Sequence, residues 1–86
     1  MPVNVTMRKA KMGSGYVVQL KNTGESVFQM KITCGKNVKN LTLNAGESKE
    51  LGWFEGIPID PGSSVTVSPA SSADHFKNIK MDVPVN

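Results

Sequence analysis

The stretch SVFQMKITC, residues Ser26–Cys34, alternates apolar and polar side chains from Phe28 onwards. Successive side chains of a β-strand point to opposite faces, so the stretch predicts a strand with one buried face and one wet face. The predicted buried residues are Phe28, Met30, Ile32 and Cys34, and the predicted wet residues are Gln29, Lys31 and Thr33. This pattern favours a sheet with one face against a core.

The same two-residue rhythm returns along the chain between turns rich in glycine and proline. Six further strands are predicted, at Val3–Met7, Tyr16–Lys21, Val38–Leu43, Ser48–Phe54, Ser64–Ser68 and Phe76–Val85. Val38 is out of phase with Leu41 and Leu43, which suggests a bulge near Lys39 and Asn40. A single turn near Ser72–Phe76 is the one helical candidate. Seven short strands at this spacing are typical of an all-β fold, a small antiparallel β-sandwich with immunoglobulin-like topology.

The inward-facing positions of these strands predict a single apolar layer. Its expected members are Val5, Met7, Val18, Leu20, Phe28, Met30, Ile32, Leu41, Leu43, Leu51, Trp53, Val65, Val67, Ile79, Met81 and Val83. A chain of 86 residues has room for one such core, so residues 1–86 are expected to form one domain.

Composition argues against two classes of partner. The net charge of +3 is mild, and one arginine with five aromatic residues does not make the basic, aromatic stripe of a nucleic-acid binder. No apolar run reaches the roughly eighteen residues that a membrane-spanning helix needs. We therefore expect no nucleic-acid partner, no membrane insertion and no basic-then-apolar leader.

The sequence gives little support for a disulfide or for a metal site with sulfur ligands. Cys34 is the only cysteine, so it has no disulfide partner within the chain, and its inward position predicts a buried thiol that packs as a small apolar group. Met7, Met30 and Met81 also fall on inward faces. A blue-copper site needs two histidines, whereas this chain has only His75. No metal site and no cofactor are expected, and a copper carrier with sulfur ligands is kept as an alternative.

Catalytic groups do not form a recognisable set. His75 lies in a polar loop beside Asp74 and two serines, Ser71 and Ser72, but adjacent positions in one loop do not supply the geometry of a triad. The carboxylates Glu47, Glu55 and Asp60 lie in turns around one segment, and solvated turn residues are the favoured interpretation. We expect no catalytic residues and no enzyme activity.

The segment Leu51–Gly56 contains the only tryptophan, next to a phenylalanine and between two glycines. The favoured interpretation is that Trp53 fills the thin core while Phe54 caps the end of the sandwich. The alternative is an exposed aromatic side chain that anchors a protein or a sugar. The candidate partner-binding residues under this alternative are Trp53, Phe54, Glu55 and Ile57.

Three phrases carry a family resemblance: LNAGESKEL at Leu43–Leu51, IDPGSSVTV at Ile59–Val67 and VQLKNTG at Val18–Gly24. Their combination of strands and turns resembles that of bacterial immunoglobulin-like and fibronectin-III-like modules. The chain differs from antibody-type domains in lacking paired cysteines. The resemblance implies an extracytoplasmic or cell-surface location and an adhesive, spacer or accessory role, and it assigns no functional residue.

These observations favour a non-catalytic interaction or spacer module of a larger secreted or cell-surface protein. Its expected partner is a protein or a carbohydrate. The alternatives are the small copper carrier and a structural subunit of a capsid or fibre.

Overall fold

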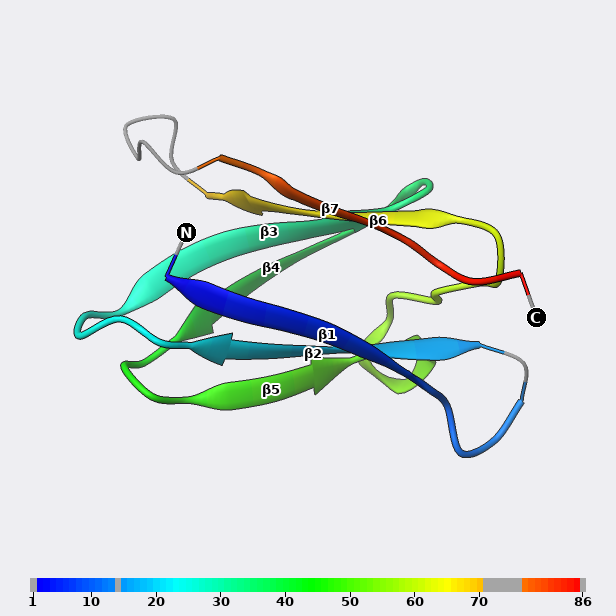
Figure 1. The fold of residues 1–86 in the computed structure, drawn as a ribbon, viewed down its shortest axis with the longest axis horizontal. Helices are drawn as coiled ribbons and strands as arrows, with labels where there is room; N and C mark the ends of the chain where they lie inside the picture. Colours follow the sequence, from blue (N-terminus) through cyan, green and yellow to red (C-terminus); the bar gives the residue numbers. More distant parts are fainter. Residues whose placement is uncertain (1, 14, 71–76, 86) are drawn as a thin grey trace.

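The computed structural model describes residues 2–13, 15–70 and 77–85, and these residues form two antiparallel sheets (Figure 1). The strands among them are β1 (Val3–Lys9), β2 (Tyr16–Asn22), β3 (Phe28–Cys34), β4 (Asn37–Leu43), β5 (Ser48–Leu51), β6 (Ser64–Pro69) and β7 (Ile79–Asp82), with a 3-10 turn, η1 (Trp53–Glu55), after β5. Sheet A has the order β1-β2-β5, and sheet B has the order β4-β3-β6-β7. The predicted all-β, two-sheet architecture is confirmed.

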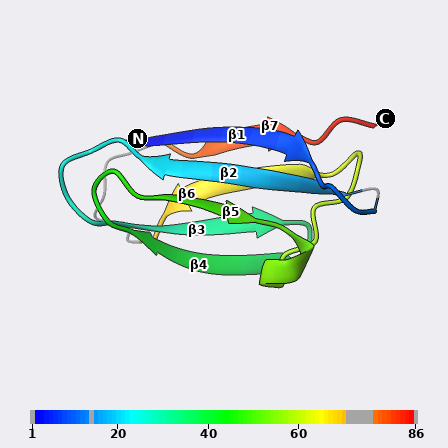
Figure 2. The same ribbon diagram turned by 90° about the horizontal axis from the view of Figure 1, so that it is seen from below.

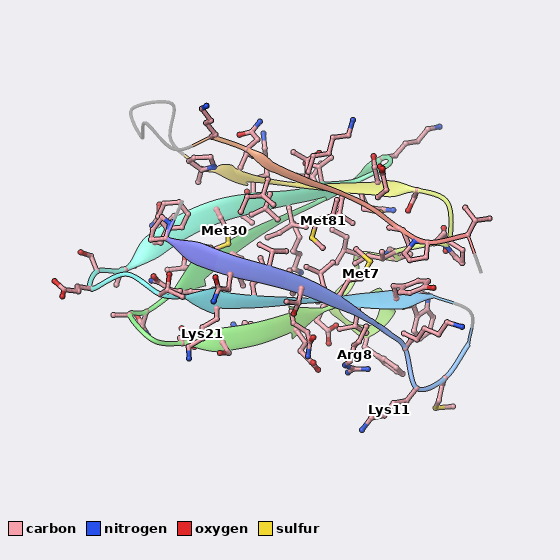
Figure 3. The ribbon with its side chains drawn as sticks, viewed as in Figure 1. Met7, Arg8, Lys11, Lys21, Met30 and Met81 are labelled. Carbon is pink, nitrogen blue, oxygen red and sulfur yellow. The ribbon has the colours of Figure 1, made fainter. Side chains whose placement is uncertain are left out.

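The two sheets lie face to face, and the apolar side chains fill the space between them (Figures 1 and 3). Met30 on β3 is completely buried in this layer (Figure 3). Seen from below, the edge strands β1 and β7 lie on the same side of the molecule (Figure 2). Each sheet therefore presents one edge to that side, and the other two edges are β4 and β5.

Most of the predicted core is confirmed. The buried members are Val18, Leu20, Phe28, Met30, Ile32, Leu41, Leu43, Leu51, Val65, Val67 and Val83. Val5, Met7 and Ile79 pack partly buried against them, and Met81 is also half-buried. Cys34 is buried on the predicted face of β3. The core also takes in Val3, Tyr16, Ile57 and Ile59, of which the two isoleucines come from a connection expected to lie outside it.

The fifth strand was predicted too long, and the placement of Trp53 in the core was wrong. Pairing of β5 with β2 ends at Leu51, opposite Val18. The chain then turns outward into η1, which leaves Trp53 70% exposed. Ile57 and Ile59, 0% and 2% exposed, occupy the core instead.

No bulge interrupts β4, contrary to the expectation at Lys39 and Asn40. The register with β3 is continuous from Phe28 opposite Leu43 to Cys34 opposite Asn37. Val38 therefore keeps its place in the alternation and lies on the outer face, 55% exposed. The outer-face residues of the edge strand β4 are all exposed to solvent, so the fold does not require a particular residue type at Val38.

The last strand is shorter than Phe76–Val85. Its pairing with β6 covers Ile79–Asp82 among the residues described. Beyond it, the Val83 amide donates to the Ser63 carbonyl at 2.8 Å, and the Gly62 amide approaches the Pro84 carbonyl at 3.2 Å. Pro84 has no amide hydrogen to continue the ladder. The helical turn expected at Ser72–Phe76 lies outside the described residues.

A buried asparagine joins the turns at one end of the sandwich. Asn22 is the last residue of β2, shares the inner face with Leu20 and is 0% exposed. Its Nδ2 donates to the Ser26 carbonyl at 2.8 Å and to the Leu43 carbonyl at 3.0 Å, and its Oδ1 accepts from the Gly24 amide at 2.9 Å. One side chain thus ties the β2–β3 turn to the end of β4.

Candidate partner-binding surface

The turn that carries Trp53 and Phe54 is fixed by local hydrogen bonds. The Gly52 amide donates to Glu55 Oε1 at 2.7 Å, and the Glu55 amide donates to the Gly52 carbonyl at 3.0 Å. Gly56 closes the turn with a φ of 83°, a left-handed conformation that favours glycine. The side chain of Glu55 is therefore part of the turn's own structure.

The chain on both sides of this turn is anchored to the core. A Cβ atom at Gly52 would lie 3.3 Å from Cγ2 of Val17, so the turn approaches β2 closely. On the other side, Ile57 is completely buried, and the Tyr16 amide donates to the carbonyl of Ile59 at 2.9 Å. Among the four candidate residues, Ile57 thus positions the turn from within the core, whereas Trp53, Phe54 and Glu55 lie at the surface.

Both aromatic side chains of the turn face solvent. Trp53 is 70% exposed and Phe54 is 80% exposed. Their rings meet edge to face, with centroids 5.2 Å apart and planes at 79°. The sequence alternation predicted opposite faces for the two residues, but a 3-10 turn replaces the strand here, and both side chains leave the core.

The aromatic pair borders a groove of about 390 Å³. One wall comes from described residues at the end of β1 and the start of β2, among them Ala10, Met12 and Tyr16, and the other from the segment that carries Trp53, Pro58 and Asp60. Met12, itself 78% exposed, lies on the first wall, and Pro58 lies on the second. The charged residues that line the groove are both acidic, Glu55 and Asp60. The groove is thus lined mainly by apolar residues, and the charged residues in its lining are negative.

Two of the turn carboxylates hold local structure, and Asp60 lines the groove together with Glu55. Glu47 Oε1 accepts from the Asn44 amide at 2.8 Å, and Glu55 Oε1 accepts from the Gly52 amide, so each closes its own turn. Within residues 2–13, 15–70 and 77–85, no three side chains of His, Cys, Asp or Glu form a group that could hold a metal ion. The loop residues Ser71, Ser72, Asp74 and His75, which were not expected to form a triad, lie outside the described residues.

The methionines that a copper site would need lie at two places in the inner layer, with Met7 and Met81 lining one cleft and Met30 in the middle of β3. Met30 is completely buried in the middle of β3, whereas Met7 and Met81 lie towards the β1–β7 side (Figure 3). Cys34 is opposite Val65 on β6, which is opposite Met81 on β7, so a valine lies between the thiol and the Met81 thioether across the sheet. The Cys34 sulfur has the Ser63 hydroxyl at 3.5 Å as its polar neighbour.

The outer face of sheet A has a polar network across all three strands. Arg8 on β1 donates to both carboxylate oxygens of Glu50 on β5, at 2.9 and 3.0 Å. Gln19 on the central strand donates to Glu50 at 2.8 Å and accepts from the Thr6 hydroxyl at 3.0 Å. Arg8, Lys11 and Lys21 extend away from the core on this side (Figure 3). These bonds connect the three strands of sheet A on its outer face.

This network predicts an acid dependence of stability. The pKa of Glu50 is lowered from 4.5 to about 2, because Arg8 and then Gln19 donate hydrogen bonds to its charged form. Since the folded-state pKa lies below the unfolded value, this stabilisation is complete above pH 4.5 and is lost as the pH falls towards 2. We expect Glu50→Gln to melt below wild type at pH 7 and to converge with it near pH 2.

The measurement is the melting temperature of both proteins at pH steps from 7 to about 2, at low and at high salt. Glu25→Gln, an exposed turn residue, is the matched control for loss of one carboxylate. A gap between Glu50→Gln and wild type that stays constant over this range would contradict the assignment. The pair is half exposed, so added salt is expected to narrow the gap.

The fold and the surface together define a two-sheet all-β protein with an aromatic groove at one end of the sandwich. Comparisons with protein-family models, with curated proteins and with solved structures gave no match. Within the described residues, no helix has the length and apolar character required to cross a bilayer.

Proposed function

We propose that the sandwich is an immunoglobulin-like module. The strand order supports this proposal: strands one, two and five form one sheet, and strands four, three, six and seven form the other. In immunoglobulin-type domains the chain likewise leaves the first sheet after strand two and returns to it for the fifth strand. The position of β4 beside β3 corresponds to the arrangement in which the fourth strand joins the second sheet.

We propose that this module is non-catalytic and binds another protein through the aromatic groove. The observation that carries the proposal is the pair Trp53 and Phe54, held in solvent on a hydrogen-bonded turn whose flanks are anchored in the core. A small domain gains stability by burying its largest side chains, and this one exposes its tryptophan. A pre-ordered aromatic pair loses little conformational entropy on binding, which favours affinity.

A peptide segment fits the groove better than a sugar. Stacking on a sugar ring favours a flat platform, whereas the Trp53 and Phe54 planes stand at 79° to each other. A concave, apolar site accommodates aliphatic or aromatic side chains, and the thioether of Met12 can adapt to their shape. Glu55 and Asp60, the charged residues of the lining, favour a basic residue nearby. The expected partner is therefore an apolar protein segment with a lysine or arginine beside it.

The tryptophan provides a direct test because it is the only one in the chain. Peptides selected from a displayed random library against the wild-type protein are titrated while Trp53 fluorescence is recorded. Desolvation on binding is expected to shift the emission to shorter wavelength. Phe54→Ala is expected to weaken binding by about 30-fold, since a central aromatic anchor contributes at least about 2 kcal/mol.

The control variant is Val38→Ala, which removes a comparably exposed apolar side chain from β4, away from the groove. It should bind as wild type, and all variants should keep wild-type melting behaviour. Selected peptides that bind Phe54→Ala as tightly as wild type would contradict the proposed site. Soluble polysaccharides that shift the emission where no peptide does would favour the carbohydrate alternative.

A further inference from the structure

Three of the four sheet edges carry features that block pairing with another strand. On β4, Lys39 occupies an inner-face position opposite Ile32, and on β5, Lys49 occupies one opposite Leu20. Inward-pointing charges at an edge prevent a further strand from docking there. The edge strand β7 has four residues and is followed by Pro84, which cannot donate to a ladder.

The fourth edge, β1, carries one such inner-face charge, Lys9 opposite Tyr16, and only at its last residue. Its seven residues pair with β2 in one continuous register, without a proline or a bulge. The inner-face residues Val3, Val5 and Met7 are apolar, and the charged residues Arg8 and Lys9 come only at its end. In the described part of the chain, β1 has β2 as its only strand partner. A strand of this length with an open hydrogen-bonding edge is a site for β-augmentation.

An apolar cleft accompanies this edge. It has a volume of about 390 Å³ and lies between the two sheets on the β1–β7 side, lined by Val5, Met7 and Met81 among others. Val5, Met7 and Met81 are all half-buried. A strand added beside β1 would place its own inner-face side chains over this cleft, because residues directly opposite each other share a face. The occupant must therefore be extended and apolar on alternate positions.

The sequence of β1 itself meets that requirement. When β1 is paired antiparallel with a second β1 over its full length, Thr6 lies opposite Thr6, and Val5 lies opposite Met7. Asn4 then lies opposite Arg8, whose charge is already balanced by Glu50. A slip by one residue sets inner against outer positions, and a slip of four towards the basic end sets Arg8 against Arg8. Slips of two residues also match faces but pair only five of the seven residues. The full-length register is therefore the one that matches faces along the whole strand, with Lys9 opposite Val3 at each end.

We infer that β1 is a self-association edge at which two copies of this chain join into one six-stranded sheet. The symmetry is two-fold, the commonest for soluble oligomers. The cleft along β1 is then closed by Val5 and Met7 of the second copy. This inference is independent of the aromatic groove, which lies beyond the end of β1.

The test is mass measurement by light scattering during size exclusion, over a range of protein concentrations. The wild-type protein is expected to approach twice its 9.3 kDa mass as concentration rises. Thr6→Lys and Thr6→Glu each place two like charges opposite each other at the two-fold axis, and each should weaken the dimer by about tenfold. A mixture of the two variants should recover the dimer, because opposite charges then face each other.

Thr42→Lys is the matched control, since Thr42 is an exposed outer-face threonine on the edge strand β4. It should dimerise as wild type. Circular dichroism melts establish that each Thr6 variant is folded. The inference is overturned if the wild-type protein stays monomeric up to millimolar concentration. It is also overturned if Thr6→Lys dimerises as well as Thr42→Lys, or if mixing the two Thr6 variants restores nothing.

Discussion

Replacing Ile32 with alanine is expected to lower the free energy of unfolding by about 2–5 kcal/mol, through lost burial and the cavity left behind. Ile32 is 0% exposed and sits at the middle of β3, between β4 and β6. A domain of this size has a total stability of roughly 5–10 kcal/mol, so the variant is expected to lose a large part of it. Denaturant unfolding measures the loss as a lower midpoint at an unchanged slope.

Val38→Ala is the control for this prediction. It truncates a β-branched apolar side chain of the neighbouring strand β4, on the outer face, where Val38 is 55% exposed. The expected change is below about 1 kcal/mol, since most surface substitutions have small effects. Equal losses for the two variants would mean that the apolar layer does not lie on the inner face of β3.

The period-two pattern was enough to predict the faces of the regular strands. Phe28, Met30 and Ile32 are buried as expected, because the register of a strand fixes every second side chain to one face. The same rule explains the failure at β4. Because Val38 is apolar, a bulge was predicted that would turn its side chain towards the core. The strand instead keeps its regular alternation, and Val38 lies on the exposed outer face. Periodicity outweighed the hydrophobicity of a single residue.

The turn at Trp53 could not be predicted from alternation, because Leu51 and Trp53 continue the phase of a strand. Local hydrogen bonds decide the outcome here: Glu55 closes a turn on the Gly52 amide, and the chain leaves the sheet. The available signal was a glycine followed three residues later by glutamate, with Gly56 after it. Ile57 and Ile59 then occupy the core space that was predicted for Trp53. The hydrogen bond from the Tyr16 amide to the Ile59 carbonyl anchors this segment.

Asn22 shows a second kind of omission, since the predicted strand Tyr16–Lys21 ended before it and the predicted core did not include it. Its position continues the inward series of Tyr16, Val18 and Leu20, and that series was the signal for its burial. A buried amide is tolerated only when its donors and acceptors are satisfied. Asn22 meets this condition with three hydrogen bonds to backbone groups, so a turn-forming residue occupies a core position.

Asn22→Ala is expected to destabilise the protein by about 2–4 kcal/mol, an effect comparable to that of a core truncation. The change leaves the carbonyls of Ser26 and Leu43 without their donor, and the Gly24 amide without its acceptor. Hydrogen exchange should quicken first at Gly24 and Gly46, whose amides belong to the turns that Asn22 joins. Denaturant unfolding and amide exchange together measure both effects.

Asn22→Asp separates the hydrogen bonds from the shape of the side chain. Aspartate has nearly the same size and keeps an acceptor for Gly24, but its charged form donates nothing to the two carbonyls. Burial raises the pKa of such a carboxyl above its unfolded value, so the stability of this variant should be highest at low pH and decline as the pH rises. Asn40→Asp on the exposed face of β4 should lack this dependence. If Asn22→Asp were as stable as wild type at pH 7, the buried amide could not be what joins the two turns.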